Sequence, residues 1–328
     1  MPGTAPRRSR SRGCSPPQTQ RGVALLVAIL LVALGTILAA AIAYENAMTF
    51  RRGAATYAFD QALLVQQGAE ALAAYGLRLA QQSDPQHTYA SEGWAQPVGP
   101  FEVVPGVMLT AQLEDLQGRF NLNNLVRQDG TPDPVQVAAF QQLLMMLGLE
   151  PKWAGYMVDW IDRDIVPSVP DGAEDSVYMG QTPPYRTPNR YITNASELLA
   201  LPGFGRDNYV ALAPYVTALP YGVKLNICTA KALVLDAFLG HGDFSSDVQG
   251  LAKNRTAATG CFPALSDYQA AADSATWSRI STKVQMTSSF FRLTSLITIG
   301  STEFNLYSLL LQDPTGQVRP ILRSFTAD

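Results

Sequence analysis

Residues 21–43 read RGVALLVAILLVALGTILAAAIA, and this stretch decides how the rest of the chain is interpreted. From Val23 to Ala43 it contains 21 residues without a charge. A helix rises about 1.5 Å per residue, so the run reaches roughly 30 Å, the thickness of a bilayer's hydrocarbon core. The apolar region of a secretory signal peptide is shorter, about 7–15 residues, and a cleavage site of small residues follows it. The length of the run therefore predicts a membrane-spanning helix.

The distribution of charge predicts the orientation of this helix. The first 22 residues contain five arginines and no acidic residue, and removing them from a net charge of −3 leaves −8 for the other 306 residues. Basic segments beside a membrane helix stay in the cytoplasm. We therefore expect a cytoplasmic N-terminus and an acidic bulk across the membrane. General binding of nucleic acid is not expected, because it requires a basic face.

Helical periodicity continues beyond the apolar run. Proline is absent between Tyr44 and Gln82, and Ser83-Asp84-Pro85 predicts the end of the helix. Small and apolar residues recur every three or four positions, as on the buried face of an amphipathic helix: Ala55, Phe59, Ala62, Val65, Ala69, Leu72 and Gly76. The predicted polar face carries Arg51, Arg52, Gln61, Gln66, Gln67 and Glu70. One helix of about 60 residues is thus expected, either as an ordinary anchor with a helical stalk or as part of a filament subunit.

The order of arginine-rich leader, glycine, apolar run and amphipathic helix resembles the type IV pilins and the pseudopilins of type II secretion. In that class a prepilin peptidase cleaves after the glycine, on the cytoplasmic side, and methylates the new N-terminus. The resemblance implies cleavage between Gly22 and Val23, so that the membrane segment stays on the mature protein. Cleavage at the alanine run 39–41 would instead divide the predicted helix.

The fifth residue after this cleavage site departs from most of the class. Most members have a glutamate there, which is thought to pair with the N-terminal ammonium of a neighbouring subunit, whereas this chain has Val27. A carboxylate in the membrane is costly unless it is paired. A chain without it cannot make that pair, which suits the first subunit of a filament. Among pseudopilins, the K-type minor subunit is the one that typically lacks this glutamate.

Strands are expected on both sides of a helical region. Residues 101–104 and 107–115 are separated by the turn Pro105-Gly106, and 119–122 follow them. Residues 288–299, 303–311 and 317–325 predict an antiparallel meander, and we expect it to share one sheet with the earlier strands, packed on the N-terminal helix. Between these groups, helices are expected at 134–149, 151–162, 196–201, 206–215 and 229–239.

The expected fold class is α+β, a pseudopilin fold with a long N-terminal helix packed on a small antiparallel sheet, into which a large helical domain is inserted between strands. This is the layout of the K-type family. The expected divisions are a leader at 1–22, the transmembrane part at 23–43, the periplasmic helix and first strands at 44–123, the inserted α-domain at 124–286 and the C-terminal strands at 287–328.

Six acidic residues gather between Val158 and Tyr178: Asp159, Asp162, Asp164, Asp171, Glu174 and Asp175. Pro167 and Pro170 predict a loop that brings the later acids back toward the earlier ones. Clustered carboxylates and backbone carbonyls are the ligands that Ca²⁺ prefers, although a solvated acidic loop remains the alternative. An EF-hand is not expected, because Val166 and Pro167 occupy its third-ligand and glycine positions. WIDRD, GAED and PPYRTPN (183–189) resemble the K-type signature, which implies calcium here, with Asp164, Glu174 and Asp175 as the first candidates.

Two further motifs are interpreted as structural. GRFNLNNL, residues 118–125, resembles a recurrent K-subunit segment, and its asparagines Asn121, Asn123 and Asn124 are expected to cap and turn the chain. LPGFG, residues 201–205, has the turn of a helix-hairpin-helix module, which in other proteins binds DNA phosphates. Only Arg206 is basic nearby, with Asp207 beside it, so we expect a scaffold packed through Leu198, Leu199, Leu201 and Phe204.

The remaining reactive residues give little sign of an enzyme. Cys14 lies in the leader, and the pair Cys228 and Cys261 predicts a disulfide in an oxidising compartment, with two buried thiols as the alternative. The two histidines, His87 and His241, are expected in loops at the surface. No nucleophile elbow, phosphate loop or His-rich metal motif is present.

These features imply a non-enzymatic minor pseudopilin of the inner membrane with a single transmembrane pass. The family resemblance implies a place at the pseudopilus tip with the I-type and J-type minor pseudopilins, initiation of assembly, and support of the export of folded proteins across the outer membrane. Further implied partners are prepilin peptidase, the major pseudopilin and the inner-membrane assembly platform. The alternatives are a DNA-binding or adhesive minor pilin of a type IV pilus or competence system, and an anchored periplasmic binding protein without leader cleavage.

Overall fold

The computed structural model describes residues 3, 20–241, 244, 255 and 260–325, and only the backbone of residues 20–22. It divides into two compact units, residues 1–60 and 61–328. The expected leader, residues 1–22 with Cys14, lies largely outside the described residues. Among the described residues of the first unit, the one element is the beginning of helix α1, Gln20–Ser83, which continues into the second unit.

Helix α1 fits a membrane anchor in its first half. Among the described residues it is the one helix that is long and apolar enough to cross a membrane. Leu25, Leu30 and Ile37 are about two-thirds exposed, as lipid-facing side chains would be in the absence of lipid. The helix ends at Ser83, where the Asp84-Pro85 sequence predicts a stop.

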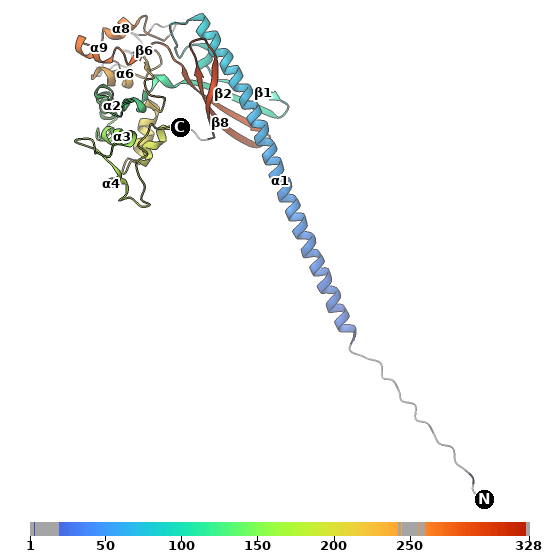
Figure 1. Cartoon of the computed structure of the whole chain (residues 1–328). Coiled ribbons are helices and arrows are strands. Elements are labelled where there is room, and N and C mark those ends of the chain that lie inside the picture. Colours follow the sequence, from blue (N-terminus) through green and yellow to red (C-terminus); the bar gives the residue numbers. More distant parts are fainter. Residues whose placement is uncertain (1–2, 4–19, 242–243, 245–254, 256–259, 326–328) are drawn as a thin grey trace. The chain divides into compact units, whose positions relative to one another are not determined.

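The second unit contains a five-stranded antiparallel sheet in the order β1-β2-β7-β8-β9 (Figure 1). Its strands are β1 Val98–Val104, β2 Val107–Asp115, β7 Phe290–Ile299, β8 Thr302–Gln312 and β9 Val318–Ser324. Strands β2 and β7 are neighbours from Val107↔Ile299 to Asp115↔Phe291. Residues 116–289 therefore leave and re-enter the sheet at one corner.

Helix α1 packs on this sheet through small side chains. Ala62, Ala69 and Ala73 are buried, and so are Leu109 and Phe291 on the facing strands. Alanines allow the backbone of the helix to approach the sheet closely. Alternation on β2, β7 and β8 supplies much of the rest of this core, because every second side chain of a strand points to the same face.

The expected faces of this helix are wrong in part, and Ala55, placed on the apolar face, is exposed. Leu72, placed on the apolar face, is 50% exposed, whereas Gln66 and Glu70, placed on the polar face, are 2% and 6% exposed. The reason is a polar contact across the core: Gln66 Nε2 donates to Ser308 Oγ at 2.9 Å, and Ser308 Oγ donates to Glu70 at 2.6 Å. Helix α1 therefore faces the sheet about one position away from the predicted stripe.

The prediction that residues 119–122 form a strand of the main sheet is also wrong. Strand β3, Phe120–Asn121, does not join the main sheet but pairs in parallel with β4, Val216–Thr217. Asn121, Asn123 and Asn124 hold this segment beside residues 219–223 through bonds to the backbone. Asn123 Nδ2 donates to Leu219 O at 2.8 Å, and Asn124 Oδ1 accepts from Gly222 N at 2.8 Å. Asn121 caps the 3-10 segment that follows it, as predicted, whereas Asn123 and Asn124 tie this segment to remote backbone.

A second apolar core extends from Phe120 to Val284 and holds the helical elements together. These are α2 Pro134–Met146, α3 Trp153–Ile161, α4 Asp175–Tyr178, α5 Gly205–Leu212, α6 Ala232–Leu239, α8 Leu265–Gln269 and α9 Ser274–Ile280. Short 3-10 segments are η1 Gly93–Ala95, η2 Leu116–Gly118, η3 Leu122–Leu125, η4 Ala195–Ala200 and η5 Ala213–Tyr215, and the strands β5 Leu225–Asn226 and β6 Val284–Gln285 pair in parallel. The expected helix 196–201 is thus a 3-10 helix, and α2 ends earlier than expected, before Gly148 with φ 72°.

Candidate metal centre

The acidic loop between α3 and α4 folds back onto α3. Asp159 is 0% exposed, and its carboxylate accepts from Ser168 N at 3.0 Å and from Ala173 N at 2.7 Å. Gly155 and Gly172 make this return possible: an added Cβ at Gly155 would collide with the carbonyl oxygen of Asp171, and one at Gly172 with Ser168 and Asp159. Asp159 therefore organises the loop through backbone N–H groups.

Three of the six predicted acids converge. Asp162 is the C-cap of α3, Glu174 is the N-cap of α4, and Asp164 follows α3 by a few residues. Carboxylate oxygens of these three residues all lie within 4.8 Å of one another. Asp162 and Glu174 are 2% and 3% exposed, whereas Asp164 is exposed, so the group opens to solvent on one side.

Two oxygens of this group are buried without a partner. Asp162 Oδ1 and Glu174 Oε1 have no hydrogen bond to any described residue. Burial, followed by the negative charges of Asp164 and Asp159, raises the pKa of Asp162 to about 7. Burial and the same two charges raise the pKa of Glu174 to about 7. Buried groups of this kind are normally satisfied, and a hard divalent cation would satisfy both oxygens at once. The residues therefore fit Ca²⁺, which takes several oxygen ligands.

The other three predicted acids have different surroundings. Both oxygens of Asp159 accept backbone hydrogen bonds. Asp171 is exposed and lies outside the converging group. Asp175 accepts from Thr187 Oγ1 at 3.2 Å and lies 3.7 Å from Arg186. Asp159, Asp171 and Asp175 are thus not brought together with the other three.

Sequence reasoning missed two residues beside the loop. Thr187 contacts Asp175, and Asn189 Nδ2 donates to Asp164 O at 3.2 Å from a backbone with φ 48°. Both belong to the segment PPYRTPN, residues 183–189, whose resemblance to a family signature does not indicate these contacts. An asparagine is among the few side chains that tolerate a positive φ, because its short polar side chain can bond locally. That signal could have marked Asn189 as a turn residue.

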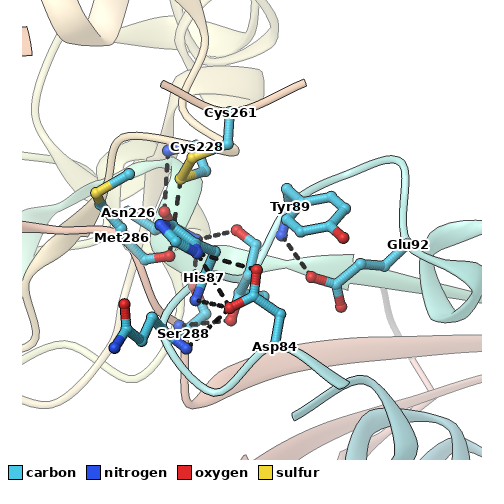
Figure 2. Close-up of polar contacts among 11 residues, drawn as sticks. Asp84, His87, Tyr89, Glu92, Asn226, Cys228, Cys261, Met286 and Ser288 are labelled. Atoms are coloured by element: carbon cyan, nitrogen blue, oxygen red, sulfur yellow. Dashed lines mark hydrogen bonds and ion pairs between the residues drawn. A yellow bond between two sulfur atoms is a disulfide. The ribbon is translucent and has the colours of Figure 1, made fainter. Parts of the chain in front are cut away.

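A separate polar cluster lies where the helical elements meet the sheet (Figure 2). The structure joins Cys228 and Cys261 by a disulfide with Cα atoms 4.3 Å apart. Cys228 N donates to Asn226 Oδ1 at 2.9 Å, and Asn226 Nδ2 donates to Asp115 at 3.0 Å. Burial raises the pKa of Asp115, although Ser288 and Thr229 also donate to it. This cluster is fully supplied with donors and is interpreted as structural.

The histidine in this region lies deeper than expected. His87 Nδ1 is 2.9 Å from Asp84 Oδ2, and its side chain is 27% exposed, so it is half-buried rather than a surface residue (Figure 2). His241 is exposed. Neither histidine lies in the converging acidic group.

The LPGFG turn forms a compact scaffold. Gly203 and Gly205 have φ values of 83° and 75°, which favour glycine, and they connect η4 to α5. Leu198, Leu201 and Phe204 are buried, but Leu199 is 46% exposed and does not belong to this core. The expected packing is therefore correct for three of its four apolar residues.

The sequence of this chain is similar to a protein family and to several known proteins. A family model described as type II secretion system (T2SS), protein K, matches residues 118–221. The chain is 36% identical over 227 residues to type II secretion system protein K of Pseudomonas aeruginosa, covering 66% of this chain and 68% of that protein. It is 38% identical over 222 residues to the protein of that description from Pectobacterium carotovorum subsp. carotovorum, covering 64% and 66%, and 39% identical over 210 residues to that from Klebsiella pneumoniae, covering 61% and 63%.

A solved structure is similar over most of the chain. It belongs to the GspK-GspI-GspJ complex of the type 2 secretion system of enterotoxigenic Escherichia coli, with a TM-score of 0.74 and 24% identity, covering 84% of this chain and 100% of that chain. The similarity shows that the fold of this chain, with its long N-terminal helix, antiparallel sheet and helical region, is shared over most of its length. Every one of these descriptions names a component of a secretion system.

Proposed function

Since the chain belongs to the family of type II secretion system protein K, we propose that it is a minor pseudopilin at the tip of the pseudopilus. In this role it initiates assembly of the filament and supports the export of folded proteins across the outer membrane. The observation that carries the proposal is one uninterrupted helix, Gln20–Ser83, whose first part fits a membrane and whose last part packs on an antiparallel sheet.

We propose that prepilin peptidase cleaves the chain between Gly22 and Val23 and methylates the new N-terminus. The five arginines of residues 1–22 favour retention of this end in the cytoplasm. The mature protein then spans the inner membrane once, with its bulk in the periplasm. Support comes from the position of the glycine directly before an uncharged run of 21 residues.

Partners are proposed by analogy with the similar structure, which is a complex with GspI and GspJ. I-type and J-type minor pseudopilins are the expected neighbours, and the major pseudopilin and the inner-membrane assembly platform are the expected context. Val27 supports a terminal position, because an apolar side chain cannot pair with the ammonium group of an earlier subunit.

Calcium is proposed as the cation of the acidic loop. Asp162, Asp164 and Glu174 would hold it, and the two orphaned buried oxygens support this assignment. The cation would neutralise like charges that otherwise repel each other, and it would fix the loop between α3 and α4. Asp159 keeps its structural contacts with Ser168 and Ala173 in either case.

The first test is the intact mass and N-terminal residue of the protein extracted from membranes. A chain that starts at Val23, heavier by one methylene group after methylation, supports a pseudopilin. Gly22→Val, with a branched side chain at the cleavage position, should retain the leader and serves as the control. A chain that keeps its leader in cells with active peptidase contradicts the filament role.

A second test addresses the position in the filament. Val27→Glu adds the carboxylate that most subunits have, whereas Val27→Leu keeps the segment apolar and is the matched control. Cross-linking to the I-type and J-type pseudopilins reports the position of each variant. If the glutamate variant stays at the tip unaffected, the missing carboxylate is not what places this subunit.

A further inference from the structure

The acidic loop ends in an apolar tip, residues 165–170, that is open to solvent. Ile165, Val166 and Val169 are 73%, 69% and 95% exposed. Pro167 and Pro170 are exposed as well, and Ser168 is the single polar residue of the segment. Contiguous exposed apolar surface on a soluble domain marks a site of interaction. The described residues of the chain leave these three aliphatic side chains uncovered, so an apolar environment from outside would stabilise the tip.

Most backbone N–H groups of the tip are either hydrogen-bonded or absent, which lowers the cost of moving the tip out of water. Val166 N donates to Asp164 Oδ1 at 2.8 Å, and Ser168 N donates to Asp159 at 3.0 Å. Pro167 and Pro170 have no N–H group. An unpaired N–H is the main cost when a loop enters an apolar phase, and four of these six residues avoid that cost.

The composition of the tip favours a lipid surface over a protein groove. Energetically dominant residues of protein interfaces are Trp, Tyr and Arg, whereas Val and Ser are under-represented. Residues 165–170 contain only Ile, Val, Pro and Ser. Insertion into a bilayer requires apolar area without a specific pocket, which a short aliphatic tip provides.

One arginine lies close to the tip in sequence, and two more flank Asn189, which contacts the loop; one of these two, Arg186, lies 3.7 Å from Asp175. Arg163 precedes it, and the exposed Arg186 and Arg190 belong to the segment that Asn189 ties to Asp164 at 3.2 Å. Arginines pair with lipid phosphates. The acids of the loop oppose this attraction, and a divalent cation held by the carboxylates would reduce the opposition.

We propose that the apolar tip, residues 165–170, inserts into an anionic phospholipid surface when a divalent cation occupies the acidic loop. The contact itself comes from the exposed aliphatic side chains and the flanking arginines. Only its dependence on calcium rests on the cation site proposed above. The tip would then give the helical region a second, weaker attachment to lipid besides α1.

The test uses the full chain, because α1 must be kept in a bilayer of its own. The protein is reconstituted into nanodiscs of phosphatidylcholine, and these are mixed with vesicles of equal parts phosphatidylethanolamine and phosphatidylglycerol. Flotation of the vesicles reports captured protein. Val169→Asp places a charge at the most exposed position of the tip, and Val210→Asp, at a 60% exposed valine of α5, is the matched control.

In calcium we expect the unaltered protein and the Val210→Asp variant to be captured alike. Capture should fall about tenfold or more with Val169→Asp, because one apolar side chain is lost from the buried area and a charge is added. A chelator should reduce capture of the unaltered protein to a similar extent. Calcium binding by the Val169→Asp variant, measured by titration calorimetry, should be unchanged, which shows that the loop is intact.

Contrary outcomes separate the two proposals. Absence of capture, or equal capture of the Val169→Asp variant, overturns the lipid contact while normal calcium binding leaves the cation site intact. If the protein binds no calcium and the chelator does not change its capture by vesicles, the cation site is overturned and the lipid contact remains. If Val169→Asp lowers exoprotein export although the unaltered protein captures no vesicles, the tip contacts a protein instead.

Discussion

Glu70 and Glu174 are both almost completely buried, yet their surroundings are opposite. Glu70, on α1, receives two hydrogen bonds from Arg323 of β9 at 2.7 Å and one from Ser308 of β8. Glu174 has an orphaned oxygen and lies beside Asp162 and Asp164. Burial by itself raises the pKa of both groups, but Arg323 and Ser308 bring the pKa of Glu70 below its ordinary value.

The contrast shows in which parts of the molecule buried carboxylates receive a counter-charge from the chain itself. The chain supplies its own counter-charge where α1 packs on the sheet. In the acidic loop it gathers negative charge and supplies no base to the buried oxygens among the residues described. A buried charge without a partner is strongly unfavourable, so the loop should depend on an external cation and the sheet should not.

Calcium should therefore separate the two regions most strongly. At a concentration about 1,000 times its Kd, it should raise the free energy of unfolding by about 4 kcal/mol. Glu174→Gln removes one ligand and should abolish most of this gain at the same calcium concentration. Denaturant unfolding of the detergent-solubilised chain, with calcium or with chelator, measures both. An equal gain in the two proteins would show that calcium binds elsewhere.

The two regions should also respond to pH with opposite signs when a chelator is present. Between pH 4.5 and about 7 the folded protein holds a proton on Glu174 that the unfolded chain releases, so stability from the acidic loop falls as pH rises through this window. The full effect is about 3 kcal/mol. Calcium should reverse this slope, since it competes with protons. Unfolding measured across this range checks the sign, and a flat profile with chelator argues against the raised pKa.

Glu70 makes the opposite contribution. Because its folded pKa is lowered, its stabilisation is present above the unfolded pKa and is lost as pH falls through the folded value. Glu70→Gln should lower the free energy of unfolding by about 1–3 kcal/mol, whether or not calcium is present. The variant Arg323→Gln is the partner control. A calcium-dependent loss in either variant would link the two regions and contradict their independence.

The smallest effect is expected at Asp171, an acid of the loop that lies outside the converging group. Asp171→Asn changes an exposed carboxylate outside the converging group, so calcium affinity should fall by less than about threefold. Asp162→Asn should lower affinity by at least about 100-fold, because it removes a charged ligand and the loss of an outer-shell partner alone costs up to about that much. Titration calorimetry of both variants distinguishes a three-residue centre from the diffuse charge of six acids.

Much of the sheet and of α1 was predictable, because their signals are local. Uninterrupted periodicity predicted α1 to Ser83, and alternation predicted β2 and the meander β7–β9 within a few residues. The burial of Glu70 was not predictable, since its partner Arg323 is 253 residues away. The strand 119–122 was predicted in the wrong sheet for the same reason, because its partner Val216 is remote.

The acidic loop shows the same limit at closer range. Composition predicted six candidate ligands, but the choice among them depends on how the chain returns onto α3. That path requires Gly155 and Gly172, where any side chain would meet backbone atoms. It turns Asp159 toward N–H groups and leaves Asp162, Asp164 and Glu174 together. Gly172 belongs to the GAED motif, but that motif does not show which backbone atoms the glycine meets, and Gly155 lies in no motif, so sequence alone could not select three acids of six.

The pairing of β2 with β7 has a consequence for how the protein acquires its fold. Asp115 and Phe291 are adjacent in the sheet but 176 positions apart in the chain. Closing a loop of that length before its interior is ordered costs entropy that grows with the logarithm of its length. The cost falls if the helical region condenses first and brings both ends to one corner. Synthesis from the N-terminus imposes that order, because β2 has no neighbour in the centre of the sheet until β7 has been made. A helical region that condenses first would thus act as a folding template for the sheet that its two ends enter.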